Sequence, residues 1–125
     1  MPKKRHQIGV IGLAALLMTL GVSAHHTGAM FDLQKSLTLQ GTVMAFQWTN
    51  PHCWIQLLVP GQQAPVEWSV EMGSVSQLYN LGWKPKTLKP GDKIIVVIHP
   101  IRDGTNGGIF VSGTDENGKA IVTAP

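Results

Sequence analysis

Cysteine is almost absent from this chain, since Cys53 is the only one among 125 residues. A single thiol cannot close an intrachain disulfide, so the fold must rest on packing alone, or on packing with a ligand. A long apolar run is missing as well. Residues 8–20 are uncharged, but this stretch of 13 residues is shorter than the roughly 20 residues that a membrane-spanning helix needs.

The first 24 residues have the pattern of a cleavable secretory signal. A basic start at residues 2–7 precedes the apolar run, and residues 21–24 have the small side chains that a signal peptidase accepts. A retained membrane anchor is the alternative, and the short run argues against it. We therefore expect cleavage after Ala24 and a periplasmic location. Residues 25–35 would form an N-terminal arm and residues 36–125 a single domain. No cysteine lies near the cut, so a lipid anchor is not expected.

An excess of charge is also missing from the mature chain. The whole sequence has ten Lys and Arg against seven Asp and Glu, but three of those cations, Lys3, Lys4 and Arg5, leave with the signal. The mature chain is then balanced at seven of each sign. Nucleic-acid binding needs a surplus of cations against phosphate, so we expect no nucleic-acid partner.

Signatures of catalysis are absent too. The sequence contains no G-x-S-x-G motif and no phosphate loop. Glu67 and Glu71 are four residues apart on one predicted strand, about 13 Å by the strand rise, which is too far for a paired-carboxylate hydrolase. Cys53 has no evident base beside it. The sequence therefore favours a binding module over an enzyme.

Hydrophobic periodicity predicts a β-rich fold with one short helix. Strands are expected at residues 36–46, 53–59, 66–72, 93–99 and 109–114, with a short edge strand at 119–122. In the first strand Leu39, Val43 and Ala45 belong to one face, and Gly41 marks a bulge or bend. The β-branched run at 93–99 suits a strand that is buried on both sides. Apolar residues at helical spacing predict a helix over 74–81, with Ser74 as N-cap and Gly82 as its stop.

This order favours a small all-β barrel of the OB-fold type. Short connections between strands favour antiparallel pairing, so we predict a five- to six-stranded antiparallel barrel with the helix between strands 3 and 4. A small open sandwich fits the same order less economically.

The histidines of the mature chain are the candidate metal ligands. Cleavage would expose His25 as the N-terminus, where its amine and imidazole together can chelate a metal. Imidazole suits copper and zinc. His52 and His99 each lie at a predicted strand end beside a proline, where they could complete the site with His25 or His26. The alternative is that these histidines bond only to the backbone. Cys53 would face away from its neighbour His52, so we expect it to be a packed core residue.

Four tryptophans are many for a domain of this size. Trp54 and Trp68 are expected in the core. Trp48, in a turn, and Trp83, after the helix stop, are freer to contact a ligand. A second candidate surface therefore consists of Trp48, Asn50, Trp83, Arg102 and Asp103.

Several segments resemble a known family. The sequence looks like the DUF6152 family, small exported bacterial proteins of unknown function, and its Trp-Thr-Asn-Pro-His element is the most specific part of the likeness. The resemblance extends over residues 25–32, 39–43, 46–55, 68–71, 81–83, 88–92 and 99–104. It implies an envelope location and supplies no activity.

The sequence is compatible with three functions. The leading hypothesis is an exported non-catalytic module that binds a copper- or zinc-type ion through His25, His26, His52 and His99. The second is an envelope protein that binds a glycan or another protein through exposed tryptophans. The third is an accessory subunit of an exported redox enzyme.

Overall fold

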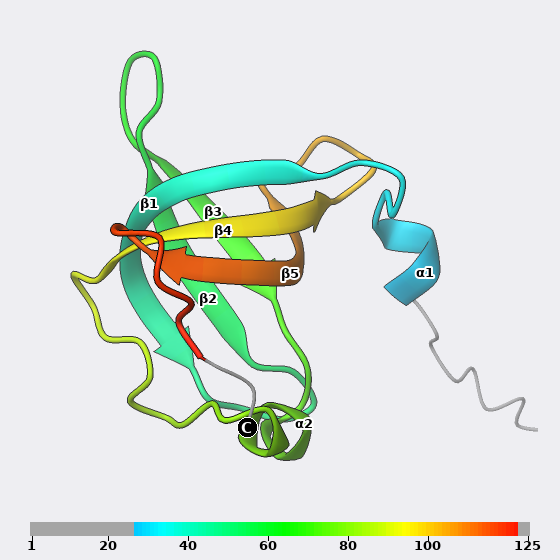
Figure 1. Cartoon of the computed structure of the whole chain (residues 1–125). Helices are drawn as coiled ribbons and strands as arrows, with labels where there is room; N and C mark the ends of the chain where they lie inside the picture. Colours follow the sequence, from blue (N-terminus) through cyan, green and yellow to red (C-terminus); the bar gives the residue numbers. More distant parts are fainter. Residues whose placement is uncertain (1–26, 123–125) are drawn as a thin grey trace, which may run out of the picture.

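Five strands close into a barrel in the order β1-β2-β3-β5-β4 (Figure 1). The structure is a computed structural model, and it describes residues 27–122. In chain order the elements are α1 (Thr27–Met30), β1 (Leu37–Gln47), β2 (Trp54–Val59), β3 (Val66–Glu71), α2 (Val75–Asn80), β4 (Lys93–Pro100) and β5 (Gly107–Asp115). The predicted OB-type order, with a helix between the third and fourth strands, is confirmed.

One pair of neighbouring strands is parallel, which corrects the expectation of a fully antiparallel barrel. β3 and β5 run in the same direction and pair from Ser69 with Gly107 to Glu71 with Ile109. All other neighbours are antiparallel. Five is an odd number, so the direction of the strands cannot alternate all the way around a closed ring. The predicted sixth strand at 119–122 is reduced to one isolated bridge between Thr114 and Ala120.

The alternation of inward- and outward-facing residues in β1 shifts by one position within the strand. Leu39, Gly41 and Val43 are buried, and the register with β2 then shifts between Val43 and Ala45. Ala45 therefore does not continue the buried face. Phe46 takes over that side and packs against the core. The predicted irregularity is real, but the bulge follows Val43 and does not lie at Gly41.

Gly41 has a different role, because it lets β1 and β2 approach closely. A Cβ at this position would lie 2.6 Å from the carbonyl oxygen of Leu58. At the same point β1 passes from its pairing with β4, which ends at Thr42, to its pairing with β2, which begins there. The glycine is thus required by the closure of the barrel and not by a turn.

β4 presents only one side to the core. Ile94, Val96 and Ile98 are buried, whereas Ile95 and Val97 are partly exposed. The expectation that β4 is buried on both sides was wrong, because in a barrel the second face of each strand meets solvent unless another layer covers it.

The short helix α2 lies below the strands at one end of the barrel (Figure 1). Its N-terminus has a capping box, in which the Ser74 side chain accepts from the Gln77 backbone N–H and the Gln77 side chain accepts from the Ser74 N–H. Leu78 points into the core, and Gly82, with φ of +91°, ends the helix. Within residues 27–122 no helix is long and apolar enough to cross a membrane.

Candidate functional site

The outer face of β2 and β3 carries a partly exposed tryptophan. Trp54 pairs with Gln47 of β1 on one side and with Glu71 of β3 on the other. The next residue, Ile55, is fully buried, so Trp54 must point outward, because successive side chains alternate across a strand. The expectation that Trp54 belongs to the core was wrong. Trp68, by contrast, packs against the core as expected.

Three polar side chains beside Trp54 form a ladder across three strands. The Ser69 hydroxyl donates to Gln56 Oε1 at 2.6 Å. The Gln56 amide then donates to Gln47 Oε1 at 2.9 Å. Each bond fixes the orientation of the next group, so the face presents a defined set of donors and acceptors. Sequence periodicity did not indicate this ladder, because cross-strand partners depend on the register.

Glu71 and His52 meet at the end of this face. Glu71 is only 8% exposed although it lies on the outer side of β3, and its Oε1 lies 3.2 Å from His52 Nδ1. The same nitrogen lies 3.0 Å from the carbonyl oxygen of Met72. A carbonyl can only accept, so Nδ1 carries the hydrogen, and in the neutral ring the lone pair is on Nε2.

His99 is held in the same way. Its Nδ1 lies 2.7 Å from the carbonyl oxygen of Lys35, which again leaves the lone pair of the neutral ring on Nε2. Both histidines therefore make the backbone bond that was the alternative to metal binding. A histidine that ligates a metal also fixes its second nitrogen in this manner, so the bond by itself does not separate the two roles.

The predicted four-histidine cluster is only partly placed by the structure. His25 and His26 lie outside the described residues. His99 pairs with Ile109, which pairs with Glu71, so two strand spacings, about 10 Å, separate the backbones of His99 and Glu71. Among residues 27–122 no three His, Cys, Asp or Glu side chains are grouped to hold a metal.

Two loops flank the face, and most of the predicted surface residues lie in them. In the loop 48–53, Trp48 is partly buried and packs edge-on against Phe46 with a centroid separation of 5.7 Å. Asn50 Oδ1 accepts from the Val75 backbone N–H at 3.0 Å, which joins this loop to α2. In the same loop Cys53 is fully buried, as expected.

The loop 101–106 borders the other side. Arg102 is exposed, and its Nη1 lies 3.8 Å from Asp32 Oδ1. Asp103 Oδ1 accepts from both the backbone N–H and the hydroxyl of Thr105. These two bonds, the backbone one first, lower the pKa of Asp103. Asp103 thus has a clear role in shaping its own turn.

Trp83 is buried, which corrects the expectation that it is free to contact ligands at the surface. It is 3% exposed, and its ring lies 5.8 Å from that of Phe46 and 5.6 Å from that of Phe110. The reason is local. After Gly82 the chain turns back beneath the helix, and the Trp83 N–H donates to the Leu78 carbonyl at 3.0 Å.

With this geometry established, comparisons with known proteins place the chain in a family. A sequence profile described as "Family of unknown function (DUF6152)" matches residues 14–111. The chain belongs to the DUF6152 family. No curated protein and no solved structure matches it. The match confirms the resemblance noted from the sequence, and it spans β1 to β4 and the first half of β5 in this DUF6152 domain.

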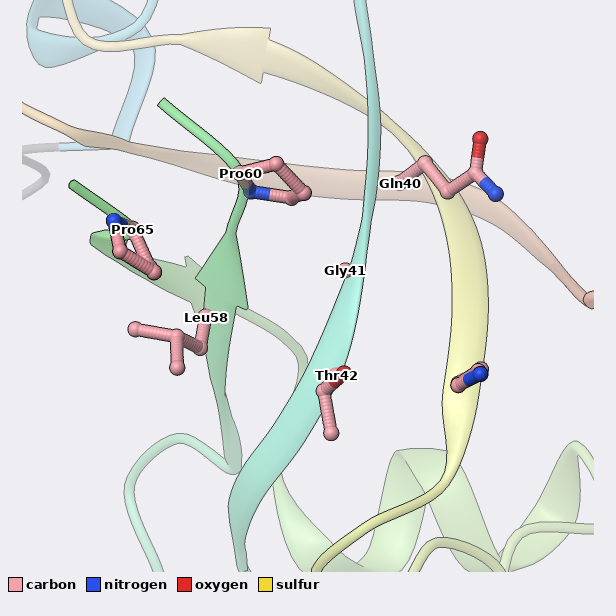
Figure 2. Close-up of a pocket in the computed structure, with 7 residues that line it drawn as sticks. Gln40, Gly41, Thr42, Leu58, Pro60 and Pro65 are labelled. Atoms are coloured by element: carbon pink, nitrogen blue, oxygen red, sulfur yellow. The ribbon is translucent and has the colours of Figure 1, made fainter. Parts of the chain in front are cut away.

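Two hollows open where paired strands of the DUF6152 domain separate. The first, of about 380 Å³, lies where β1 leaves β2, and Figure 2 shows Leu58, Pro60 and Pro65 beside the Gly41 segment. The second, of about 690 Å³, lies between α2 and the first part of β5, and we call it the α2 hollow. Its lining includes His52, Met72, Leu78, Leu81, Trp83 and Val111. Sequence periodicity did not indicate either hollow, since both depend on where strand pairing stops.

Proposed function

We propose that this protein is an exported, non-catalytic binding module that takes an oligosaccharide on the outer face of β2 and β3. The observation that carries the proposal is the grouping of the Trp54 indole with the Gln47–Gln56–Ser69 ladder and Glu71 on one face. An indole supports the apolar side of a sugar ring, and oriented amides and hydroxyls bond to its hydroxyls. OB-type barrels bind oligosaccharides and oligonucleotides on this same face.

Charge favours a sugar over a nucleic acid as the ligand. Glu67, which is exposed, and Glu71 both lie on this side of β3. Carboxylates on the contact face would repel phosphates, and the chain beyond residue 24 carries no surplus of cations to compensate. Sugar hydroxyls, in contrast, are good donors to carboxylate and amide oxygens.

Export is the second element of the proposal and rests on residues 1–24. The basic start, the short apolar run and the small residues before His25 support it. Its test is N-terminal sequencing of the protein recovered from the cell envelope of an expressing bacterium. A mature chain that begins at His25 would support export, and an uncleaved chain confined to the cytosol would contradict it.

Calorimetric titration with chitohexaose, cellohexaose and laminarihexaose tests the oligosaccharide site. Trp54→Ala should weaken binding of the preferred sugar about 30-fold, because truncating a tryptophan anchor typically removes about 2 kcal/mol. The matched control is Tyr79→Ala, which removes an aromatic ring that is 57% exposed and belongs to α2, not to β2 or β3. Equal losses in the two variants, or no binding of any sugar by the native protein, would contradict the proposal.

A copper- or zinc-type ion bound by His25, His26, His52 and His99 is the second candidate function. The observation that favours it is that His52 and His99 both use Nδ1 on backbone carbonyls, which leaves Nε2 for a metal. The arm also docks near His99, since Phe31 bridges to Ile101.

Titration of Cu(II) and Zn(II) distinguishes this candidate from the first. The protein that starts at His25 is compared with a version that carries one extra N-terminal residue, which removes the free amine from His25. Tight binding that collapses with the extra residue, and weakens in His99→Ala more than in Cys53→Ala, supports the metal site. Binding that is indifferent to both changes contradicts it.

A further inference from the structure

We infer that the α2 hollow is a second binding site, separate from the oligosaccharide face, for an uncharged ring-shaped small molecule that carries a hydroxyl group. The hollow exists because β3 and β5 pair only as far as Glu71 and Ile109. Beyond that point β3 leads through Gly73 into α2, and β5 continues past Phe110. Its volume of about 690 Å³ lies in the range of roughly 300–1,000 Å³ that small-molecule sites occupy.

The floor of the hollow consists of core side chains. Met72, Leu78 and Trp83 line it although each is 5% exposed or less. The Trp83 and Phe110 rings meet edge to face, at an interplanar angle of 88°. Flat apolar walls of this kind favour a ring-shaped ligand, whose edge or face can pack on the two aromatic rings.

Part of the rim is apolar and extends this surface outward, and the uncharged amide side chains of Gln77 and Asn80 also line the hollow. Leu81, the C-cap of α2, is 54% exposed and Val111 on β5 is 47% exposed, and both line the hollow. Among the described residues the lining contains no Asp, Glu, Lys or Arg. Burial of a charged ligand without a partner is costly, so the ligand should be uncharged.

Of the polar side chains that line the hollow, His52, Gln77 and Asn80, the neutral imidazole of His52 offers it an acceptor without a donor. Its Nδ1 is engaged by the Met72 carbonyl, and no bond to its Nε2 is found among the described residues. The lone pair on Nε2 of the neutral ring can only accept, so the matching group on the ligand is a donor such as a phenolic or alcoholic hydroxyl. A recessed floor of core residues suits a small molecule. A protein partner would need a contact of about 800 Å² on each side, so we infer a small molecule as the occupant and not a protein.

The test uses two probes that differ in one donor, 2-naphthol and 2-methoxynaphthalene, titrated into the ¹⁵N-labelled protein. We expect 2-naphthol to shift the indole N–H resonance of Trp83 and to bind about fivefold more tightly than the ether, the difference expected for one neutral hydrogen bond. No shift at Trp83 with either probe would overturn the inference.

Variants then locate the site and the donor contact. Val111→Trp fills the mouth and should weaken 2-naphthol binding at least tenfold, whereas Leu37→Trp, at a comparably exposed strand position outside the hollow, should not. Equal affinities in the two variants would overturn the location. His52→Phe keeps an aromatic ring and should remove the preference for 2-naphthol, and a retained preference would overturn the role of Nε2. A titration of Val111→Trp with the sugars shows whether the same substitution affects the oligosaccharide face. The outcome at the α2 hollow can then be distinguished from the outcome at that face.

Discussion

The replacement Gly41→Ala tests the closure of the barrel directly. A Cβ at this position would lie 2.6 Å from the Leu58 carbonyl oxygen and 2.9 Å from Leu57 Cγ. The first of these neighbours is backbone in a paired strand, so no side-chain rotation relieves the clash and β1 must move away from β2. Overpacking of a core typically destabilises by about 1–3 kcal/mol. Replacing glycine also restricts the unfolded chain, which by itself raises the free energy of unfolding by about 0.4–1 kcal/mol.

The expected net effect is a loss of about 1–2 kcal/mol in the free energy of unfolding. Urea titration monitored by tryptophan fluorescence measures this loss, and a thermal melt should show a fall in Tm of about 5–15 °C for a domain of this size. Gly113→Ala in β5 is the matched control. Its nearest neighbours are the end of the Ile121 side chain, at 2.8 Å, which can rotate away, and the Phe110 ring, at 3.1 Å, which need move by only a few tenths of an ångström. Equal losses in both variants, or an unchanged Gly41→Ala protein, would refute this account of the closure.

Three further predictions concern local interactions. Ser74→Ala removes the N-cap of α2 and should lower the free energy of unfolding by about 1 kcal/mol in urea titration; no change would mean that the cap is idle. Carbon-detected NMR should give Asp103 a pKa below its ordinary value, because both bonds from Thr105 favour the carboxylate. The stability that these two bonds contribute is present above the ordinary pKa of an aspartate and is lost as the pH falls through the lowered pKa of Asp103. Thr105→Val should raise that pKa only part of the way, since the backbone bond remains, and an unchanged value would contradict the hydroxyl's role. The Cys53 thiol is fully buried, so a thiol reagent should modify it at a measurable rate only after denaturant is added, and rapid labelling of the native protein would contradict its burial.

The regular elements could be predicted because their signals are local. Alternation of apolar residues located every strand of the barrel to within a few residues, and Ser74 and Gly82 correctly bounded the helix. The parallel pair was missed because short connections suggest antiparallel neighbours. β3 and β5 are not consecutive, however, and a helix and a whole strand lie between them in the chain.

The candidate site was predicted less well because it depends on register. The expected exposure was wrong for both Trp54, which was placed in the core, and Trp83, which was placed at the surface. Trp54 is adjacent to the fully buried Ile55 and therefore faces out, although its neighbours in sequence are apolar. Trp83 follows a glycine stop but is drawn under α2 by its bond to the Leu78 carbonyl. The contact between His52 and Glu71 could not be read from spacing either, since 19 positions separate them in the chain.

The closure of a five-stranded ring explains why both candidate sites lie at the same end of β3. An odd ring requires one parallel pair, and here that pair extends over only three positions of β3, from Ser69 to Glu71. Ser69 belongs to the polar ladder and Glu71 contacts His52, so the outer face ends where the parallel pairing ends. Beyond it the strands separate, and the α2 hollow occupies the space between them. His52 lies between the two regions, since it contacts Glu71 and also lines the hollow. His52 thus marks the boundary between the two regions, because its Nδ1 lies beside the last outward carboxylate of β3 while its ring lines the hollow.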